Sequence, residues 1–151
     1  DLNNDGIYDF TLNTITDVVN CGTRCRTSNR YIANVTIARG SNNGIVYKLA
    51  DYLVSPLGSQ SIIDSSSQWS YITDRALVIY VQQTGNCGTC SSYGVWGGNG
   101  DRYMGLKLVM DQNTYYGWVR LIDNLVFRKL IVQDYAYNSI PNQPILAGQT
   151  K

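Results

Sequence analysis

The first nine residues carry oxygen-bearing groups at the spacing of a calcium-binding loop. Oxygen ligands at alternate positions, with a glycine where the chain must turn sharply, are what wrapping a loop around Ca²⁺ requires, and Gly6 stands at that turn. An EF-hand would need Glu at position 12, where this chain has Leu12. We therefore predict a structural Ca²⁺ ion outside the EF-hand class, against the alternative of an Asn/Asp-Gly turn that binds nothing. The predicted ligands are Asp1, Asn3, Asp5, Ile7 through its backbone carbonyl, and Asp9.

The four cysteines form two close pairs, Cys21 with Cys25 and Cys87 with Cys90. Two structural disulfides fit an even number of cysteines in a chain rich in Asn, Ser, Thr and Tyr, and they imply an oxidising compartment. The connectivity is not fixed by the sequence. A four-thiolate zinc site is the main alternative. A redox pair is disfavoured because no helix is predicted at Cys87.

The composition excludes most catalytic chemistry. The chain has no His, and its 11 acidic residues are all Asp. Ser-His-Asp and Cys-His catalysis and His-ligated zinc therefore cannot be built from this chain alone. Paired-Asp hydrolysis remains, but nothing in the spacing of the Asp residues selects a pair. We predict that the protein is not an enzyme.

Charge and hydropathy exclude two kinds of partner. The formal net charge is +1 without a long basic run, so a nucleic acid is not expected as a partner. No apolar run approaches the roughly 20 residues needed to span a bilayer, so no membrane span is predicted. The chain begins at Asp1 without an initiator Met, which we interpret as a processed form or a fragment.

Alternating or continuous apolar segments rich in Val, Ile, Tyr and Thr predict strands throughout the chain. We expect an all-β, single-domain antiparallel β-sandwich over residues 1–151, of Greek-key or jelly-roll type. The predicted strands are Ile7–Leu12, Tyr31–Ala38, Gly44–Leu49, Ala76–Gln82, Tyr103–Met110, Tyr115–Ile122 and Leu125–Asp134.

The last three strands are nearly contiguous and predict a C-terminal meander with turns at residues 111–114 and at Asp123–Asn124. In its middle strand, Tyr116 and Trp118 should share one face, and Gly117 and Val119 the other. Long loops are expected at Ser55–Ser70 and Thr84–Asp101. Residues 136–151 contain two prolines and should form an extended C-terminal segment at an edge.

Aromatic side chains and one sequon complete the candidate sites. Trp69, Trp96, Tyr116 and Trp118 could stack on sugar rings or form an interface, although packing in the core is the commoner use of such residues. Asn34-Val35-Thr36 is an acceptor sequence for N-glycosylation at Asn34.

Several stretches resemble secreted bacterial proteins of the PEP-CTERM-sorted type. The N-terminal segment matches their DxNxDGxxDF pattern, and Tyr115–Arg120, Ala136-Tyr137 and Pro141–Gly148 match their HYGWxR, AYE and PxxxIxAG patterns. Tyr115 stands where the family often has His, Asn138 replaces the usual Glu, and no sorting anchor follows Lys151, which implies cleavage or truncation. The resemblance covers roughly half of the chain. It implies an extracellular, non-enzymatic β domain.

Together these features predict a structural subunit of an extracellular or cell-surface assembly, such as a fibre, filament or surface matrix. The chain would polymerise with copies of itself through a terminal strand, stabilised by Ca²⁺ and disulfides. The donor strand would be Ile140–Thr150 or the N-terminal strand from Ile7. The alternative is a carbohydrate-binding or adhesive module with polysaccharide as its partner.

Overall fold

The computed structural model describes residues 1–19, 27–39, 41–48, 53–72, 75–84, 93–94, 96, 101–124 and 129–150. Within these ranges every regular element is a β-strand and every strand pairing is antiparallel, so the predicted all-β class is confirmed. The four cysteines, and with them the disulfide and zinc predictions, lie outside the described residues.

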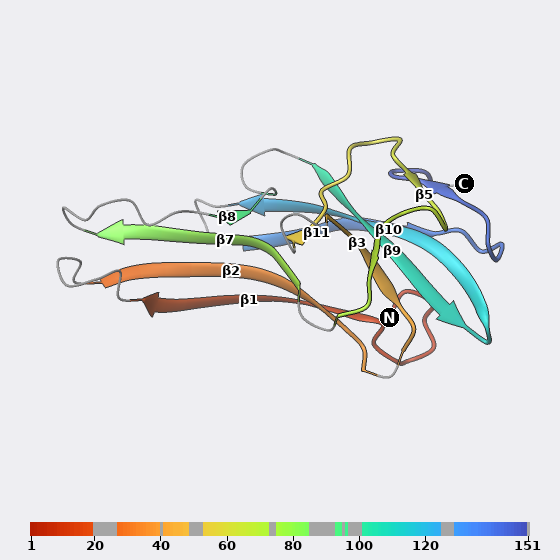
Figure 1. Ribbon diagram of the computed structural model, residues 1–151, viewed down its shortest axis with the longest axis horizontal. Helices are drawn as coiled ribbons and strands as arrows, with labels where there is room; N and C mark the ends of the chain where they lie inside the picture. Colours follow the sequence, from red (N-terminus) through yellow and green to blue (C-terminus); the bar gives the residue numbers. More distant parts are fainter. Residues whose placement is uncertain are drawn as a thin grey trace.

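Sheet A contains four strands in the order β1-β2-β7-β8. Its strands are β1 (Phe10–Val19), β2 (Thr27–Ile37), β7 (Arg75–Thr84) and β8 (Tyr93–Gly94). Three of them run side by side along the length of the molecule (Figure 1). β1 pairs with β2 over its whole length, from Phe10 opposite Ile37 to Val19 opposite Ser28. Among the described strands, β2 is the single neighbour of β1, so β1 is an edge strand.

Sheet B is built around the predicted meander. Its path is β11-β10-β9-β3-β4, and β6 also pairs with β3. The strands are β3 (Gly44–Lys48), β4 (Leu53–Val54), β6 (Trp69–Ser70), β9 (Arg102–Met110), β10 (Asn113–Asn124) and β11 (Lys129–Tyr137). The pairings of β10 with β9 and with β11 confirm the meander. Its far edge is β11.

The main core lies between the two sheets because alternate side chains of each sheet face the other. Tyr31, Ala33, Val35 and Ile37 of β2 are at most 1% exposed, whereas the residues between them are partly exposed. They pack in one cluster with residues of β9 and β10. The remaining buried members of this cluster are Ile45, Val54, Trp96, Met104, Leu106, Val119 and Leu121.

A second core covers the opposite face of sheet B. Tyr116 and Trp118 of β10 point to this side, as their alternation with Gly117 and Val119 predicts. The two-stranded ribbon of β5 (Ile62–Ile63) and β12 (Ile145–Leu146) lies over them and contributes buried Ile63 and Ile145. Sheet B is therefore covered on both faces, which explains the unbroken buried run at Tyr103–Leu106.

Several boundaries differ from the sequence prediction. β1 begins at Phe10 instead of Ile7 and continues to Val19 instead of ending at Leu12. The predicted turn at Asp123–Asn124 is wrong: both residues belong to β10 and pair with β11, and residues 125–128 lie outside the described part. The predicted loop Ser55–Ser70 contains β5 and β6.

Candidate functional site

The N-terminal loop is organised by carboxylates that accept backbone N–H groups. The two carboxylate oxygens of Asp1 accept from the amides of Asp5 at 3.1 Å and Gly6 at 2.9 Å. Asp5 in turn accepts from the amide of Ile7 at 2.8 Å. The chain turns through left-handed conformations at Asn4 (φ 62°) and Gly6 (φ 86°), and the second of these suits glycine because it has no Cβ. The loop is thus folded back on itself by carboxylate-to-amide hydrogen bonds.

Asp9 fixes the end of this loop to both sheets. Its side chain is buried, with the whole residue 8% exposed. One carboxylate oxygen accepts from the backbone N–H of Leu2 at 2.8 Å. The other accepts from the side-chain Nδ2 of Asn43 at 3.4 Å. Asn43 is itself held by the Val109 amide of β9, which donates to its side-chain oxygen at 2.8 Å. Through Asp9 the loop is anchored where β1 begins and where β9 ends.

The donor set offers only oxygen ligands, the kind that Ca²⁺ prefers. Among the residues that the structure describes, however, no three His, Cys, Asp or Glu side chains gather closely enough to hold a metal ion. The carboxylates of Asp1, Asp5 and Asp9 are each directed at backbone N–H groups instead. The predicted set also includes Asn3 and a backbone carbonyl, so calcium binding stays a prediction.

The same loop predicts an acid-sensitive contribution to stability. The amide of Ile7, followed by the side chain of Asn3, lowers the pKa of Asp5 below its ordinary value of 3.8. The hydroxyl and then the amide of Ser66 do the same for the pKa of Asp64. Because the folded-state pKa values are depressed, the stabilisation is present above pH 3.8 and is lost as the pH falls through the lowered values. We expect urea unfolding without calcium to show stability that falls with pH in this range.

The variants Asp5→Asn and Asp64→Asn provide the test of this prediction. An Asn side chain can still accept the backbone N–H group, but it does not titrate. Each substitution should therefore flatten part of the acid limb, and the double variant should flatten more. A double variant whose stability falls with pH as steeply as that of the unchanged chain would contradict the assignment.

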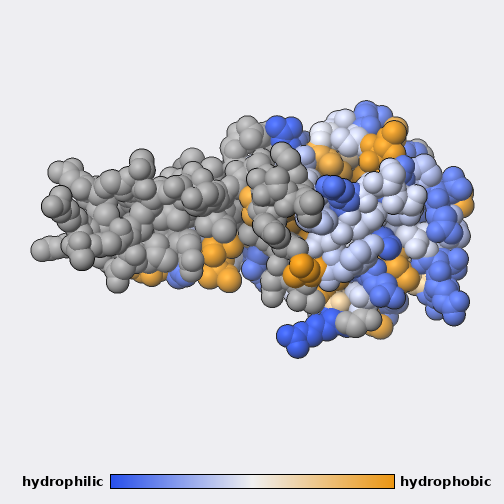
Figure 2. Space-filling view, viewed as in Figure 1, coloured by the Kyte–Doolittle hydropathy of each residue, from blue (hydrophilic) through white to orange (hydrophobic). Residues whose placement is uncertain are grey.

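An apolar groove opens on one side of the sandwich, between the edge strands β1 and β11. Its volume is about 310 Å³. Phe10 and Leu12 of β1 line one wall, and Val132 and Tyr135 of β11 line the other, 47% and 54% exposed respectively. The floor is core from β9 and β10, so the two sheets are not closed over one another along this side. Figure 2 shows apolar side chains along the border of the molecule where β1 lies.

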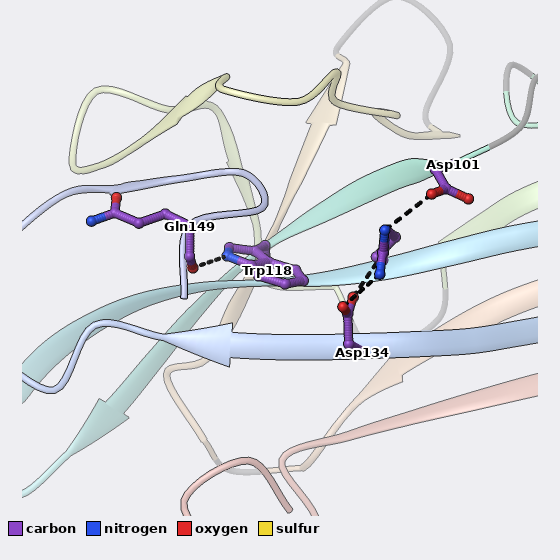
Figure 3. A network of polar contacts seen from close by, with 5 residues as sticks. Asp101, Trp118, Asp134 and Gln149 are labelled. Atoms are coloured by element: carbon purple, nitrogen blue, oxygen red, sulfur yellow. Dashed lines mark hydrogen bonds and ion pairs between the residues drawn. The ribbon is translucent and has the colours of Figure 1, made fainter. Parts of the chain in front are cut away.

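The two edge strands are protected to different degrees. β11 contains a bulge, because Val132 pairs with Leu121 while Asp134 pairs with Arg120, which leaves Gln133 between them. Asp101 and Asp134, both labelled in Figure 3, each form an ion pair with the guanidinium group of Arg120. Arg120 contacts the two oxygens of Asp134 at 2.9 and 2.6 Å and Asp101 at 3.1 Å, and the hydrogen bond to Asp134 raises the pKa of Arg120. Bulges and charges are the usual means of blunting an edge, and β11 has both.

β1 lacks these features. Its sequence, FTLNTITDVV, contains no Pro, Gly, Lys or Arg, and Asp17 is its one charged residue. Its pairing with β2 keeps one register throughout, without a bulge. Ile15 and Val18 are 46% and 62% exposed. A long and regular edge of this kind, with few charges, is a template for another strand.

The aromatic residues proposed as sugar contacts serve mainly in packing. Trp96, Tyr116 and Trp118 are between 1% and 4% exposed, so their ring faces are covered by protein. Trp69 is partly exposed and stacks on Tyr116 with ring centroids 5.8 Å apart. The indole N–H groups of two of these residues have acceptors inside the protein. Trp96 donates to the Val54 carbonyl, and Trp118 donates to the Gln149 carbonyl. The three buried rings therefore serve in packing, the commoner use of such residues, and are not available as sugar contacts.

Asn34, the predicted glycosylation site, lies in the middle of β2, where it pairs with Asn13 of β1 and Ala76 of β7. Its side-chain oxygen is buried, and no hydrogen-bond partner for it is found in the described structure. Glycosylation stays a prediction. In the part of the chain that the structure describes, there is no helix long and apolar enough to cross a membrane.

The groove and the ion pairs of Arg120 with Asp101 and Asp134 were not predicted from the sequence. Arg120 and Asp134 carry opposite charges in neighbouring strands of the predicted meander, and this was the signal from which their ion pair could have been predicted. The groove depends on how two sheets overlap, and no local pattern encodes that. Comparisons of this chain with protein-family models, with curated proteins and with solved structures find no match.

Proposed function

We propose that this chain is a non-enzymatic structural subunit of an extracellular assembly, formed by copies of itself that associate through a strand edge. The observation that carries the proposal is β1, a ten-residue edge strand without a bulge, a proline or a basic residue. Exposed edges of this length are normally blunted in proteins that stay monomeric. Here the other long edge strand of the described structure, β11, is blunted and β1 is not.

The proposal differs from donation of a terminal strand. The C-terminal segment is occupied within its own chain, because Ile145 and Leu146 pair with β5 and Ala147 is fully buried. β1 is likewise held by β2. Association through the free side of β1 needs neither segment to leave its place.

Two further features support a structural, secreted subunit. The chain lacks His and Glu and carries few charges. The resemblance to secreted bacterial PEP-CTERM-sorted proteins agrees with a location outside the cell or on its surface. We also propose that Ca²⁺ binds the N-terminal loop, since that loop leads directly into β1 and would set the position of its first residues.

Electron microscopy of concentrated protein in calcium-containing buffer tests the function. We expect ordered assemblies, such as fibres or sheets, whose repeating unit contains at least two copies of the chain. Fields that contain only dispersed single particles, at every concentration and with calcium present, would count against a structural assembly role.

A further inference from the structure

We propose that two copies of this chain associate by antiparallel pairing of β1 with β1, about a twofold axis at Thr14. The inference rests on the proposed function and names its partner and its register. It follows from three properties of β1: which backbone groups face outward, which register uses all of them, and where the single charge then lies.

The pairing of β1 with β2 determines which residues of β1 have free backbone groups. The amide of Ala38 donates to the carbonyl of Asp9 at 3.0 Å, so these two residues form a hydrogen-bonded pair just before the strand. Hydrogen-bonded and non-hydrogen-bonded pairs alternate along an antiparallel ladder. Because the register stays constant through β1, the odd-numbered residues bond to β2. The residues whose N–H and C=O groups point to the free side are Phe10, Leu12, Thr14, Thr16 and Val18.

One twofold register pairs all five of these residues in both copies. With Thr14 opposite Thr14 of the second copy, Leu12 lies opposite Thr16, and Phe10 lies opposite Val18. Shifting the axis toward either end leaves at least one outward-facing residue without a partner inside the strand. The N–H and C=O groups of β1 thus favour this register over its neighbours.

The side chains are compatible with the same register. Asp17 lies opposite Thr11 of the second copy, so the one charge of the strand does not face itself. On the outer face, Ile15 lies opposite Asn13. On the inner face, the second copy's Val18, which is 62% exposed in the single chain, lies beside Phe10 at the mouth of the groove. The second copy therefore covers exposed apolar surface on both β1 strands.

Cysteine cross-linking tests the register. Residues 13 and 15 face each other as a non-hydrogen-bonded pair, with a Cα–Cα distance of about 4.5 Å, which a disulfide can span. We expect a mixture of Asn13→Cys and Ile15→Cys chains to form a disulfide between these positions, identified by mass spectrometry of the linked peptides. Each variant alone should not link to itself through the new cysteine. A mixture of Thr11→Cys and Ile15→Cys chains is the matched control and should not link either.

Two charge substitutions give a second, independent readout. Thr14→Lys places two like charges opposite each other at the axis, so the dissociation constant should rise by about fivefold. Thr11→Lys also adds one positive charge, but it lies opposite the negative Asp17 of the second copy, so association should stay the same or strengthen. Both sites are exposed, so both variants should fold. The difference between them should shrink at high salt.

The outcomes separate this inference from the proposed function. The inference is supported if a disulfide forms between positions 13 and 15 of two copies and if association is weakened by Thr14→Lys but not by Thr11→Lys. Association that persists without the link, or that is weakened by Ile131→Lys on β11 and not by Thr14→Lys, would overturn the β1 register while leaving self-assembly in place. Absence of any association would overturn both.

Discussion

Replacing Trp118 with alanine should cost about 3–5 kcal/mol of unfolding free energy, the range for deleting a buried aromatic side chain. Trp118 is 1% exposed, and its ring meets the edge of Tyr103 with centroids 5.3 Å apart. Its indole nitrogen also donates to the Gln149 carbonyl at 3.0 Å, which holds the C-terminal segment on sheet B (Figure 3). The substitution therefore removes both a buried ring and the hydrogen bond that holds the C-terminal segment.

The measurement is urea or thermal unfolding of the Trp118→Ala chain. For a protein of this size the loss corresponds to a fall of the melting temperature by roughly 6–20 °C. Trp118→Phe keeps most of the apolar volume and loses the hydrogen bond, so its cost should be smaller. Ile140→Ala, at a residue 60% exposed, is the surface control and should change stability by less than about 0.5 kcal/mol. A cost for Trp118→Ala as small as that of Ile140→Ala would contradict the second core.

Removing calcium is expected to have the second largest effect. If the N-terminal loop binds Ca²⁺ in the folded state alone, calcium at a hundred times its dissociation constant stabilises the fold by about 2.7 kcal/mol. Chelation should then lower the melting temperature by roughly 5–11 °C. The physical basis is that Asp1, Asn3 and Asp5 would exchange some of their present N–H contacts for the ion.

A matched pair of variants assigns the calcium effect to the loop. Asp5→Asn removes one predicted carboxylate ligand and should abolish most of the dependence of melting on calcium. Asp64→Asn changes a carboxylate that also accepts an N–H group in a turn, from Ser66 at 2.8 Å, but lies outside the loop, and it should leave the dependence intact. Melting curves that coincide with and without a chelator would rule out the ion.

The sequence was sufficient to predict the class of fold and most of its strands. The clearest case is the meander, where short connections and strict alternation placed Tyr116 and Trp118 on one face and Gly117 and Val119 on the other. Such predictions succeed because they depend on local spacing and on the two-residue period of a strand.

The failures come from contacts between distant segments. Beyond Leu12, β1 alternates only weakly because Asn13, Thr14, Thr16 and Asp17 interrupt the apolar pattern, and its strand form depends on pairing with β2. Ile62 and Ile63 lie in a Ser-rich stretch and become a strand by pairing with Leu146 and Ile145, over eighty residues away. The buried rings of Trp96 and Trp118 could not be separated from exposed ones because the covering segments are not their sequence neighbours.

The candidate site was predicted in part. The loop spacing drew attention to Asp1, Asn3, Asp5 and Asp9 as calcium ligands, which stays a prediction, whereas the link from Asp9 through Asn43 to β9 joins three segments and has no local signal. The groove likewise arises from the offset of two sheets. What could be read in advance is the lack of protective residues in β1, once the strand is known to lie at an edge.

Sedimentation velocity of the unmodified chain, in calcium-containing buffer over a wide range of concentrations, tests the central claim that copies of this chain associate with each other. We predict a weight-average sedimentation coefficient that rises with concentration from that of a monomer to that of a dimer or a larger assembly, and that falls back when Thr14 is replaced by Lys. A coefficient that stays at the monomer value at every concentration would contradict the claim.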